Sequence, residues 1–217
     1  MHGEILTSLT LEQGRKWLDS YSKAKSFFED KLNKRLFIFY GTLLGYARDR
    51  SLIPHDDDFD AAYWSDYSTP LAVKEEMIEI LARVLTLFPT VHIHLLGFFF
   101  KLRLGGDTID IFPCWHDGQR LWVPWATSIQ CAADLLKEQE RVVFLEKEVY
   151  IPKGWEEFLS KKYGDNWRTP DPGYRDRRLN NVHYSFDDYA FTKEDLNIIV
   201  DKAYADSNVS QIGTITF

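Results

Sequence analysis

The sequence GTLLGYARD at residues 41–49, followed by HDDDFD at residues 55–60, decides the fold of this chain. The two segments lie between apolar runs at residues 36–40 and 59–64. We therefore predict a strand at 35–40, a tight Gly-Thr turn, a short helix, an acidic loop and a second strand at 58–64.

The turn and the acidic loop suit a phosphate and a metal ion. A turn that opens a helix presents free backbone N–H groups and the positive end of the helix dipole, so we expect Gly41 and Thr42 to hold phosphate oxygens. Four Asp occur within residues 56–60, and they repel one another unless a cation neutralises them. On an extended strand Asp58 and Asp60 point to the same face. This pattern predicts a Mg²⁺-dependent transferase that acts on an activated phosphate, with Mn²⁺ as an alternative ion.

A hairpin further along the chain adds a third acid. The Gly pair at 105–106 separates apolar runs at 98–104 and 108–112, which is typical of a two-residue hairpin turn. The register that places Lys101 opposite Asp110 gives one wholly apolar face and one polar face, and a shift by one residue mixes them. In this register the ammonium is close enough to lower the pKa of Asp110. A lowered pKa would keep the carboxylate ionised as a metal ligand and weaken it as a base.

Three basic residues are candidate ligands for substrate phosphates, namely Arg48, Lys101 and Arg103. Each also has a structural alternative. Arg48 could pair with an acid, and Lys101 and Arg103 could hold Asp110 in place. The roles of Asp56 and Asp57 stay open between structure and ligand binding.

Outside these motifs the pattern predicts helices and strands of ordinary length. His92 and His94 share one strand face, and without a third ligand at a telling spacing they indicate a polar strand face. Further expected elements are a helix at 11–33 opened by a capping box at 10–13, a helix from Thr69-Pro70 to about Phe88, strands at 91–95 and 142–151, a short helix at 155–163 and a last helix at 192–205 capped by Thr192.

Composition limits the class of protein. The chain has 217 residues, a net charge of −7 and a pI near 5.4. Because a protein that follows a phosphate backbone normally carries a basic stripe, a nucleic-acid partner is disfavoured. Two cysteines form no disulfide framework and no metal-ligand spacing. With no signal peptide and no apolar run of about 20 residues, we expect a cytoplasmic protein without a transmembrane segment.

The motifs resemble those of the LicD/fukutin-related family, within the DNA-polymerase-beta-like nucleotidyltransferase superfamily. The resemblance rests on residues 41–49, on LIPHDDDFD at 52–60 and on IDIFP at 109–113, with a weaker part at 149–165. It covers roughly residues 36–185 and keeps the order of the motifs. The sequence departs from the pattern at Arg50, where relatives often have Gly, which affects the shape of the turn.

The resemblance implies an α+β fold: a nucleotidyltransferase-like mixed sheet flanked by helices, with extra helical and loop elements at the C-terminus. We expect one domain over 1–217, with its catalytic core at 35–113 and a C-terminal part at 114–217. By motif, Asp58 and Asp60 resemble the metal-binding pair and Asp110 the third carboxylate. His183 lies where relatives have a basic, His-bearing segment, and it is a further candidate for substrate binding.

The resemblance also implies an activity. Family members transfer a phosphate-linked group, such as phosphorylcholine or a polyol phosphate, from a CDP-activated donor to a sugar hydroxyl of a glycan or surface polysaccharide, including capsules, and release CMP. Two alternatives stay open. The same fold could add a nucleoside monophosphate to a small molecule, or the chain could be a non-catalytic subunit of a glycan-assembly complex.

Overall fold

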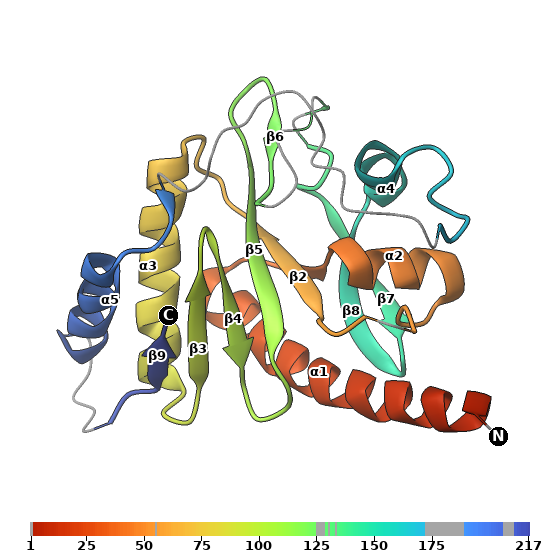
Figure 1. Cartoon of the computed structure of the whole chain (residues 1–217). Helices are drawn as coiled ribbons and strands as arrows, with labels where there is room; N and C mark the ends of the chain where they lie inside the picture. Colours follow the sequence, from red (N-terminus) through yellow and green to blue (C-terminus); the bar gives the residue numbers. More distant parts are fainter. Residues whose placement is uncertain are drawn as a thin grey trace.

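The computed structural model describes residues 2–54, 56–124, 129, 131–132, 134–171, 189–205 and 211–217, with side chains from residue 11 onward. In this part of the chain nine strands form one mixed sheet, and five helices flank it (Figure 1). The predicted α+β fold is therefore confirmed. The helices are α1 (His2–Leu32), α2 (Tyr40–Asp49), α3 (Pro70–Leu87), α4 (Trp155–Tyr163) and α5 (Lys193–Ala205).

The strands follow the order β7-β8-β1-β2-β5-β4-β3-β9, and β6 pairs with the end of β5. Their bounds are β1 Leu36–Ile38, β2 Asp60–Trp64, β3 His92–Leu96, β4 Phe99–Arg103, β5 Ile109–His116, β6 Leu121–Trp122, β7 Gln139–Phe144, β8 Lys147–Pro152 and β9 Thr214–Thr216. The central pair, β2 and β5, is parallel, and β1 and β4 lie antiparallel on either side of it. The acidic residues of the sequence motifs therefore come from the middle of the sheet.

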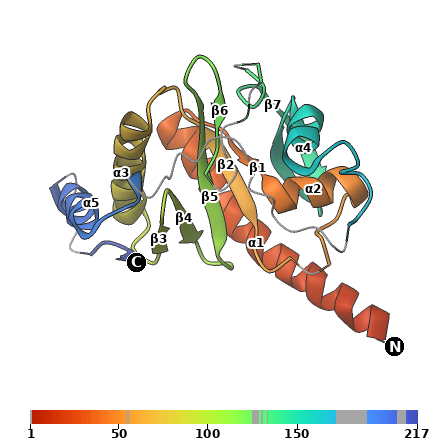
Figure 2. The same cartoon turned by 45° about the horizontal axis from the view of Figure 1, so that its top comes forward.

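The two faces of the sheet are covered by different helices. From α1, the ring of Tyr21 lies 5.6 Å from Phe59. On the opposite face Phe158 of α4 stacks on Phe39 at 4.8 Å. Helix α2 contacts α4, and Figure 2 shows the two lying together, apart from α3 and α5. Because successive strand residues alternate in direction, Asp60 points to the face that carries α4.

The predicted hairpin register is confirmed. Lys101 pairs with Asp110, and the neighbouring residues of β4 and β5 pair as expected, with the apolar set buried. The Gly105-Gly106 loop is held by α1, because the Gly106 N–H donates to the Ser20 hydroxyl at 3.2 Å and the next N–H donates to the Lys16 carbonyl. The alternation of apolar and polar residues was sufficient to predict this register.

The predicted starts of α3, α4 and α5 are confirmed. The Thr69 hydroxyl accepts a hydrogen bond from the Ala72 N–H at 3.4 Å. Thr192 and Asp195 form a reciprocal capping box, with the Asp195 N–H 3.2 Å from the Thr192 hydroxyl. Of the described helices, none is both long and apolar enough to cross a membrane.

Two predicted elements differ from the structure. Helix α1 begins at His2 and not at residue 11, so the proposed capping box lies inside the helix. Residues 2–10 contain no Pro that would stop helical hydrogen bonding. The single strand predicted at 142–151 is a hairpin of β7 and β8. Its turn residues Leu145 and Glu146 have φ of 47° and 68°, a conformation that Gly, Asn or Asp usually signals.

The hairpin of β7 and β8 enlarges the sheet beyond the expected core at 35–113. Strand β8 lies parallel to β1, with Tyr150 opposite Phe37.

Arg50, where relatives often have Gly, caps α2 with φ 52° and ψ 30°. Its guanidinium lies 4.1 Å from the Tyr46 ring and donates to the Tyr46 carbonyl. These contacts hold an arginine in a left-handed conformation that favours glycine.

Candidate active site

Three carboxylates converge at the centre of the sheet. Asp60 begins β2, and its partner in the parallel register is Asp110 of β5. Asp58 precedes β2 by two residues. One oxygen of each of these three Asp lies within 4.8 Å of the other two. The predicted convergence is therefore present, whereas the role of the three as metal ligands stays a prediction.

The first turn of α2 positions Asp60. The Gly41 N–H donates to Asp60 Oδ2 at 3.0 Å, and the Thr42 hydroxyl accepts from the Asp60 N–H at 2.8 Å. Thr42 is fully buried. The sequence predicts that both residues hold substrate phosphate oxygens. In the structure the Gly41 N–H binds the Asp60 carboxylate and the Thr42 hydroxyl binds the Asp60 backbone, so both residues position Asp60.

Asp56 belongs to the same cluster. Its Oδ2 is buried and has no hydrogen-bond partner among the described residues. A Cβ on Gly41 would lie 2.7 Å from this oxygen, so the absence of a side chain at residue 41 makes room for it. Asp57 is exposed. The structure thus answers in part whether Asp56 and Asp57 have a structural or a ligand-binding role: Asp56 faces the site, and Asp57 faces solvent.

Burial and mutual repulsion raise the pKa values of the acids. Burial is the largest cause for Asp56, whose pKa rises to about 7, and the charge of Asp58 adds to it. The pKa of Asp60 rises well above its usual value through burial and the charges of Asp58 and Asp110. The pKa of Asp58 is raised by burial and by the charge of Asp57. Carboxylates arranged in this way resist full ionisation unless a cation joins them.

Lys101 is bonded to Asp110. Its Nζ donates to both carboxylate oxygens at 2.8 Å. The hairpin register predicts a lowered pKa for Asp110, but burial raises it to about 6, and the hydrogen bond and charge of Lys101 offset this only in part. The prediction is wrong in net direction because β5 lies in the middle of the sheet, where desolvation outweighs the ion pair.

The acids lie in a cleft of about 470 Å³, within the size range of small-molecule sites. Its other walls come from α2, β4, β5 and α4, and they were not predicted: Tyr40, Phe99, Phe112, Lys162 and Tyr163. Phe99 stacks on Phe112 at 4.7 Å. Lys162 is 7% exposed, and its Nζ lies 5.1 Å from the centre of the Tyr40 ring. The weak motif at 149–165 was the one signal in the sequence that pointed to this wall.

The remaining candidate residues lie elsewhere. Arg48 donates from Nε to the Trp167 carbonyl at 2.6 Å and from a terminal nitrogen to the Thr169 carbonyl, so it holds the segment after α4. Arg103 is exposed on β4 and lines a neighbouring groove. His183 falls outside the described residues. The structure therefore brings Lys101 into contact with the acids, and it does not bring Arg48 there.

A divalent cation fits this donor set. Mg²⁺ and Mn²⁺ prefer carboxylate oxygens, and Asp58, Asp60 and Asp110 supply three that converge. The unpartnered oxygen of Asp56 adds a fourth acceptor beside them. Full ionisation of the cluster needs positive charge, of which Lys101 supplies one unit.

Comparison with protein families adds an independent observation. The family model described as LicD/FKTN/FKRP, nucleotidyltransferase domain, matches residues 33–154, more than half of the chain. This chain belongs to the LicD/FKTN/FKRP family. The match includes all three converging carboxylates, and it makes the protein a glycan-modifying transferase of this family. A search of curated proteins finds no match.

Proposed function

We propose that this LicD/FKTN/FKRP family member is a Mg²⁺-dependent phosphotransferase. It would move a phosphate-linked group from a CDP-activated donor to a sugar hydroxyl of a glycan or surface polysaccharide and release CMP. The observation that carries the proposal is the convergence of Asp58, Asp60 and Asp110 in a cleft that also holds Lys162 and aromatic walls.

In this proposal Asp58, Asp60 and Asp110 hold the metal ion. When bound, Mg²⁺ would neutralise the pyrophosphate of the donor and orient it for in-line attack. The Gly41 N–H holds the Asp60 carboxylate at 3.0 Å, and the Thr42 hydroxyl holds the backbone N–H of Asp60 at 2.8 Å. A ligand held in this way keeps its geometry without reorganisation when substrate binds.

The two lysines lie on different walls of the acidic cluster. Lys162 comes from α4, and Lys101 comes from β4. We propose that the buried ammonium of Lys162 contacts a donor phosphate oxygen, since Lys is a common phosphate ligand. The rings of Phe99 and Phe112 supply an apolar wall that keeps water from the phosphates.

The transfer step exchanges one bond at phosphorus for another. The acceptor hydroxyl oxygen forms a bond to the donor phosphorus that carries the transferred group. The bond from this phosphorus to the bridging oxygen breaks, and that oxygen leaves with CMP. Asp110, which lies beside the reacting groups in this proposal, takes the proton of the hydroxyl.

A panel of CDP-linked donors tests the proposal. The chain is incubated with each donor, Mg²⁺ and candidate acceptors, and phosphorus NMR follows the products. Release of CMP with a new phosphodiester on the acceptor supports the phosphotransferase. Attachment of CMP to the small molecule would show nucleotidyl transfer instead. If calorimetry detects no binding of divalent metal and no donor is consumed, the chain is a non-catalytic subunit. A cytoplasmic location stays a prediction.

A further inference from the structure

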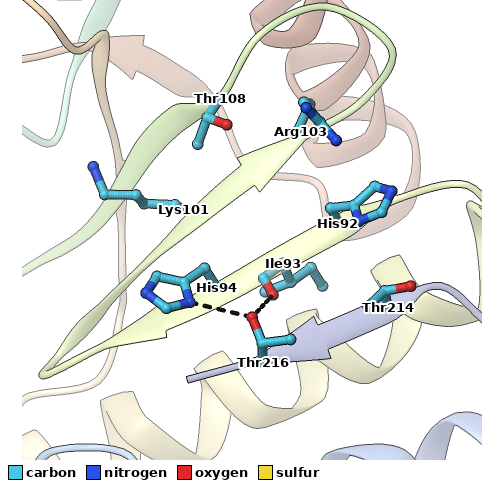
Figure 3. A pocket seen from close by; sticks show the side chains of 8 residues that line it. All are labelled: His92, Ile93, His94, Lys101, Arg103, Thr108, Thr214 and Thr216. Carbon is cyan, nitrogen blue, oxygen red and sulfur yellow. Dashed lines mark hydrogen bonds between the residues drawn. The ribbon is translucent and has the colours of Figure 1, made fainter.

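A second hollow lies beside the cleft, on the same open face of the sheet. It measures about 210 Å³ and is formed by β3, β4 and the C-terminal strand β9. Figure 3 shows its polar lining: His92, His94, Arg103, Thr108, Thr214 and Thr216. We call these six residues the groove. None of them is used by the transfer step proposed above. Lys101, which donates to Asp110, also lines the hollow.

The sheet register connects the groove to the acids. Thr216 pairs with His94, His94 pairs with Lys101, and Lys101 pairs with Asp110, which in turn lies opposite Asp60. These five residues form one row across neighbouring strands. Because strands lie about 4.8 Å apart, His94 is about 10 Å from Asp110 along this row. One substrate could therefore occupy the groove and still reach the reacting phosphorus.

The groove gathers hydrogen-bond donors and positive charge in an acidic protein. Arg103 lies directly opposite His92, so a guanidinium and an imidazole ring lie side by side on the groove wall. The Arg103 guanidinium is exposed and makes no hydrogen bond or salt bridge with a described residue, although its charge reaches Asp107. No carboxylate lines the groove within the described part of the chain. An anion at this position would pair with the charge of Arg103.

The side chains of the groove suit an anion better than a metal ion. Within the described ranges, the clusters that could hold a metal ion consist of Asp residues alone, and neither histidine belongs to one. His94 Nδ1 lies 3.2 Å from the Thr216 hydroxyl, which donates to the Ile93 carbonyl at 3.4 Å. This chain of bonds fixes the imidazole ring on the groove wall (Figure 3). Guanidinium, imidazole and hydroxyl groups together match the oxygens of a phosphate or a carboxylate.

We propose that the groove is a subsite for an anionic group of the acceptor glycan, a phosphate or a carboxylate carried by a sugar. This inference rests on the proposed function, because it assigns the acceptor to one side of the transfer centre. The CDP-linked donor is assigned to the other side, since Tyr40, Lys162 and Tyr163 come from α2 and α4. The groove lies beyond β5, on β4, β3 and β9.

Binding without turnover tests the subsite. Glucose 6-phosphate, glucuronate and glucose are titrated into the full chain without donor or metal, and binding is followed by calorimetry and NMR. We expect saturable binding of the two anionic sugars and none of glucose. Arg103→Gln and His92→Gln should each weaken the anionic sugars at least tenfold. Lys153→Gln, which removes an exposed positive charge elsewhere, should bind as the wild type does.

Further variants distinguish whether the groove binds the acceptor or the donor. They also distinguish failure of this inference from failure of the proposed function. Asp58→Asn should retain sugar-phosphate binding, since Asp58 belongs to the cleft. If Arg103→Gln weakens CDP-choline and leaves sugar phosphate unchanged, the groove holds the donor and the inference is overturned. Absence of sugar-phosphate and glucuronate binding to the folded wild type also overturns it. If these sugars bind but no donor releases CMP, the subsite stands and the proposed transfer reaction fails.

Discussion

Lys101 and Asp110 face each other across β4 and β5, and the lysine Nζ donates to both carboxylate oxygens at 2.8 Å. Even so, burial raises the pKa of Asp110 to about 6. The ammonium therefore holds a carboxylate that the protein interior would otherwise protonate. A metal ion that takes an Asp110 oxygen must share it with this ammonium or displace it.

Replacement of this lysine should weaken metal binding before it harms the fold. In Lys101→Met the pKa of Asp110 should rise further, because the hydrogen bond and charge that lower it are lost. At pH 7 a larger fraction of Asp110 is then protonated and cannot bind a metal ion. The Mg²⁺ affinity should therefore fall about tenfold, as expected for the loss of one charge-assisted hydrogen bond. The loss should shrink at pH 8.5. Calorimetric titration at both pH values measures it.

Lys153→Met is a matched control for that experiment, since its ammonium is exposed and pairs with Glu138. Its Mg²⁺ affinity should equal that of the wild type. Unchanged affinity in Lys101→Met at pH 7 would show that Asp110 does not depend on the lysine for its charge.

Loss of a single ligand charge should abolish turnover. Asp58→Asn and Asp60→Asn each keep the size of the side chain, and in Asp60→Asn the amide retains an oxygen for the Gly41 N–H, which donates to the native carboxylate at 3.0 Å. We expect CMP release to fall at least a hundredfold with an unchanged circular dichroism spectrum, because a ligand charge is removed and not packing. Asp66→Asn, on an exposed acid, should keep full activity. Near-normal turnover in either site variant would refute the metal assignment.

The buried hydroxyl of Thr42 gives a stability prediction. It accepts from the Asp60 N–H at 2.8 Å, so Thr42→Val would leave that buried N–H without a partner. The variant should lose about 1–3 kcal/mol in the free energy of unfolding, and its turnover should fall because Asp60 loses its anchor. Urea denaturation and CMP release measure the two effects.

Thr42→Ser separates the hydroxyl from the methyl group. It retains the acceptor, so activity should stay near the wild-type value while some packing is lost. Equal turnover in the Val and Ser variants would mean that the hydrogen bond to Asp60 has no part in positioning the carboxylate.

The acidic part of the site, formed by the loop before β2 and by β4 and β5, was predictable from local sequence patterns. The acidic loop and the register of Lys101 with Asp110 depend on alternation and on short turns, which a single sequence displays. The hairpin turn at Leu145 and Glu146 carries none of the usual turn residues, although both adopt positive φ. The sequence therefore shows no sign that β7 and β8 are separate strands.

The far wall of the cleft depends on contacts between distant segments. Lys162 reaches Tyr40 because Phe158 of α4 stacks on Phe39, the residue between β1 and α2. Helical spacing places Lys162 on the buried face of α4 with Phe158 and Leu159, but it does not show which segment that face contacts. The net pKa of Asp110 was also unpredictable, because the depth of β5 in the sheet decides how strongly desolvation competes with the ion pair.

The metal-free protein should lose stability as the pH rises. The pKa values of Asp56 and Asp110 in the folded state are raised to about 7 and about 6. The stability that these two groups contribute is therefore full below their pKa in the unfolded state, and it is lost as the pH rises through the folded-state values. Each pKa unit corresponds to about 1.4 kcal/mol. Between pH 5 and pH 8 the loss should be of the order of a few kcal/mol, or roughly 5–10 °C in Tm.

Mg²⁺ should reverse this loss at pH 8 and have little effect at pH 5, because its ligands must be ionised. Calorimetric scans in chelator and in Mg²⁺ at four pH values measure both trends. In Asp110→Asn the decline in chelator should be smaller. A metal-free Tm that rises from pH 5 to pH 8 would contradict the raised pKa values.

Lys162 provides the sharpest test of the donor side of the cleft. The residue is 7% exposed, and its ammonium lies over the Tyr40 ring next to the acids. If this charge contacts a donor phosphate, Lys162→Met should raise the KM for the CDP-linked donor by roughly 10–100-fold, in line with one charge-assisted hydrogen bond. Methionine keeps most of the apolar length, so the fold should persist.

Lys161→Met is the matched control, because this neighbour on α4 pairs with Glu157 at 3.5 Å. Steady-state kinetics with CMP release as the readout compares the two variants. A donor KM in Lys162→Met equal to that of Lys161→Met would restrict Lys162 to its contacts with the tyrosine rings and remove it from the donor site.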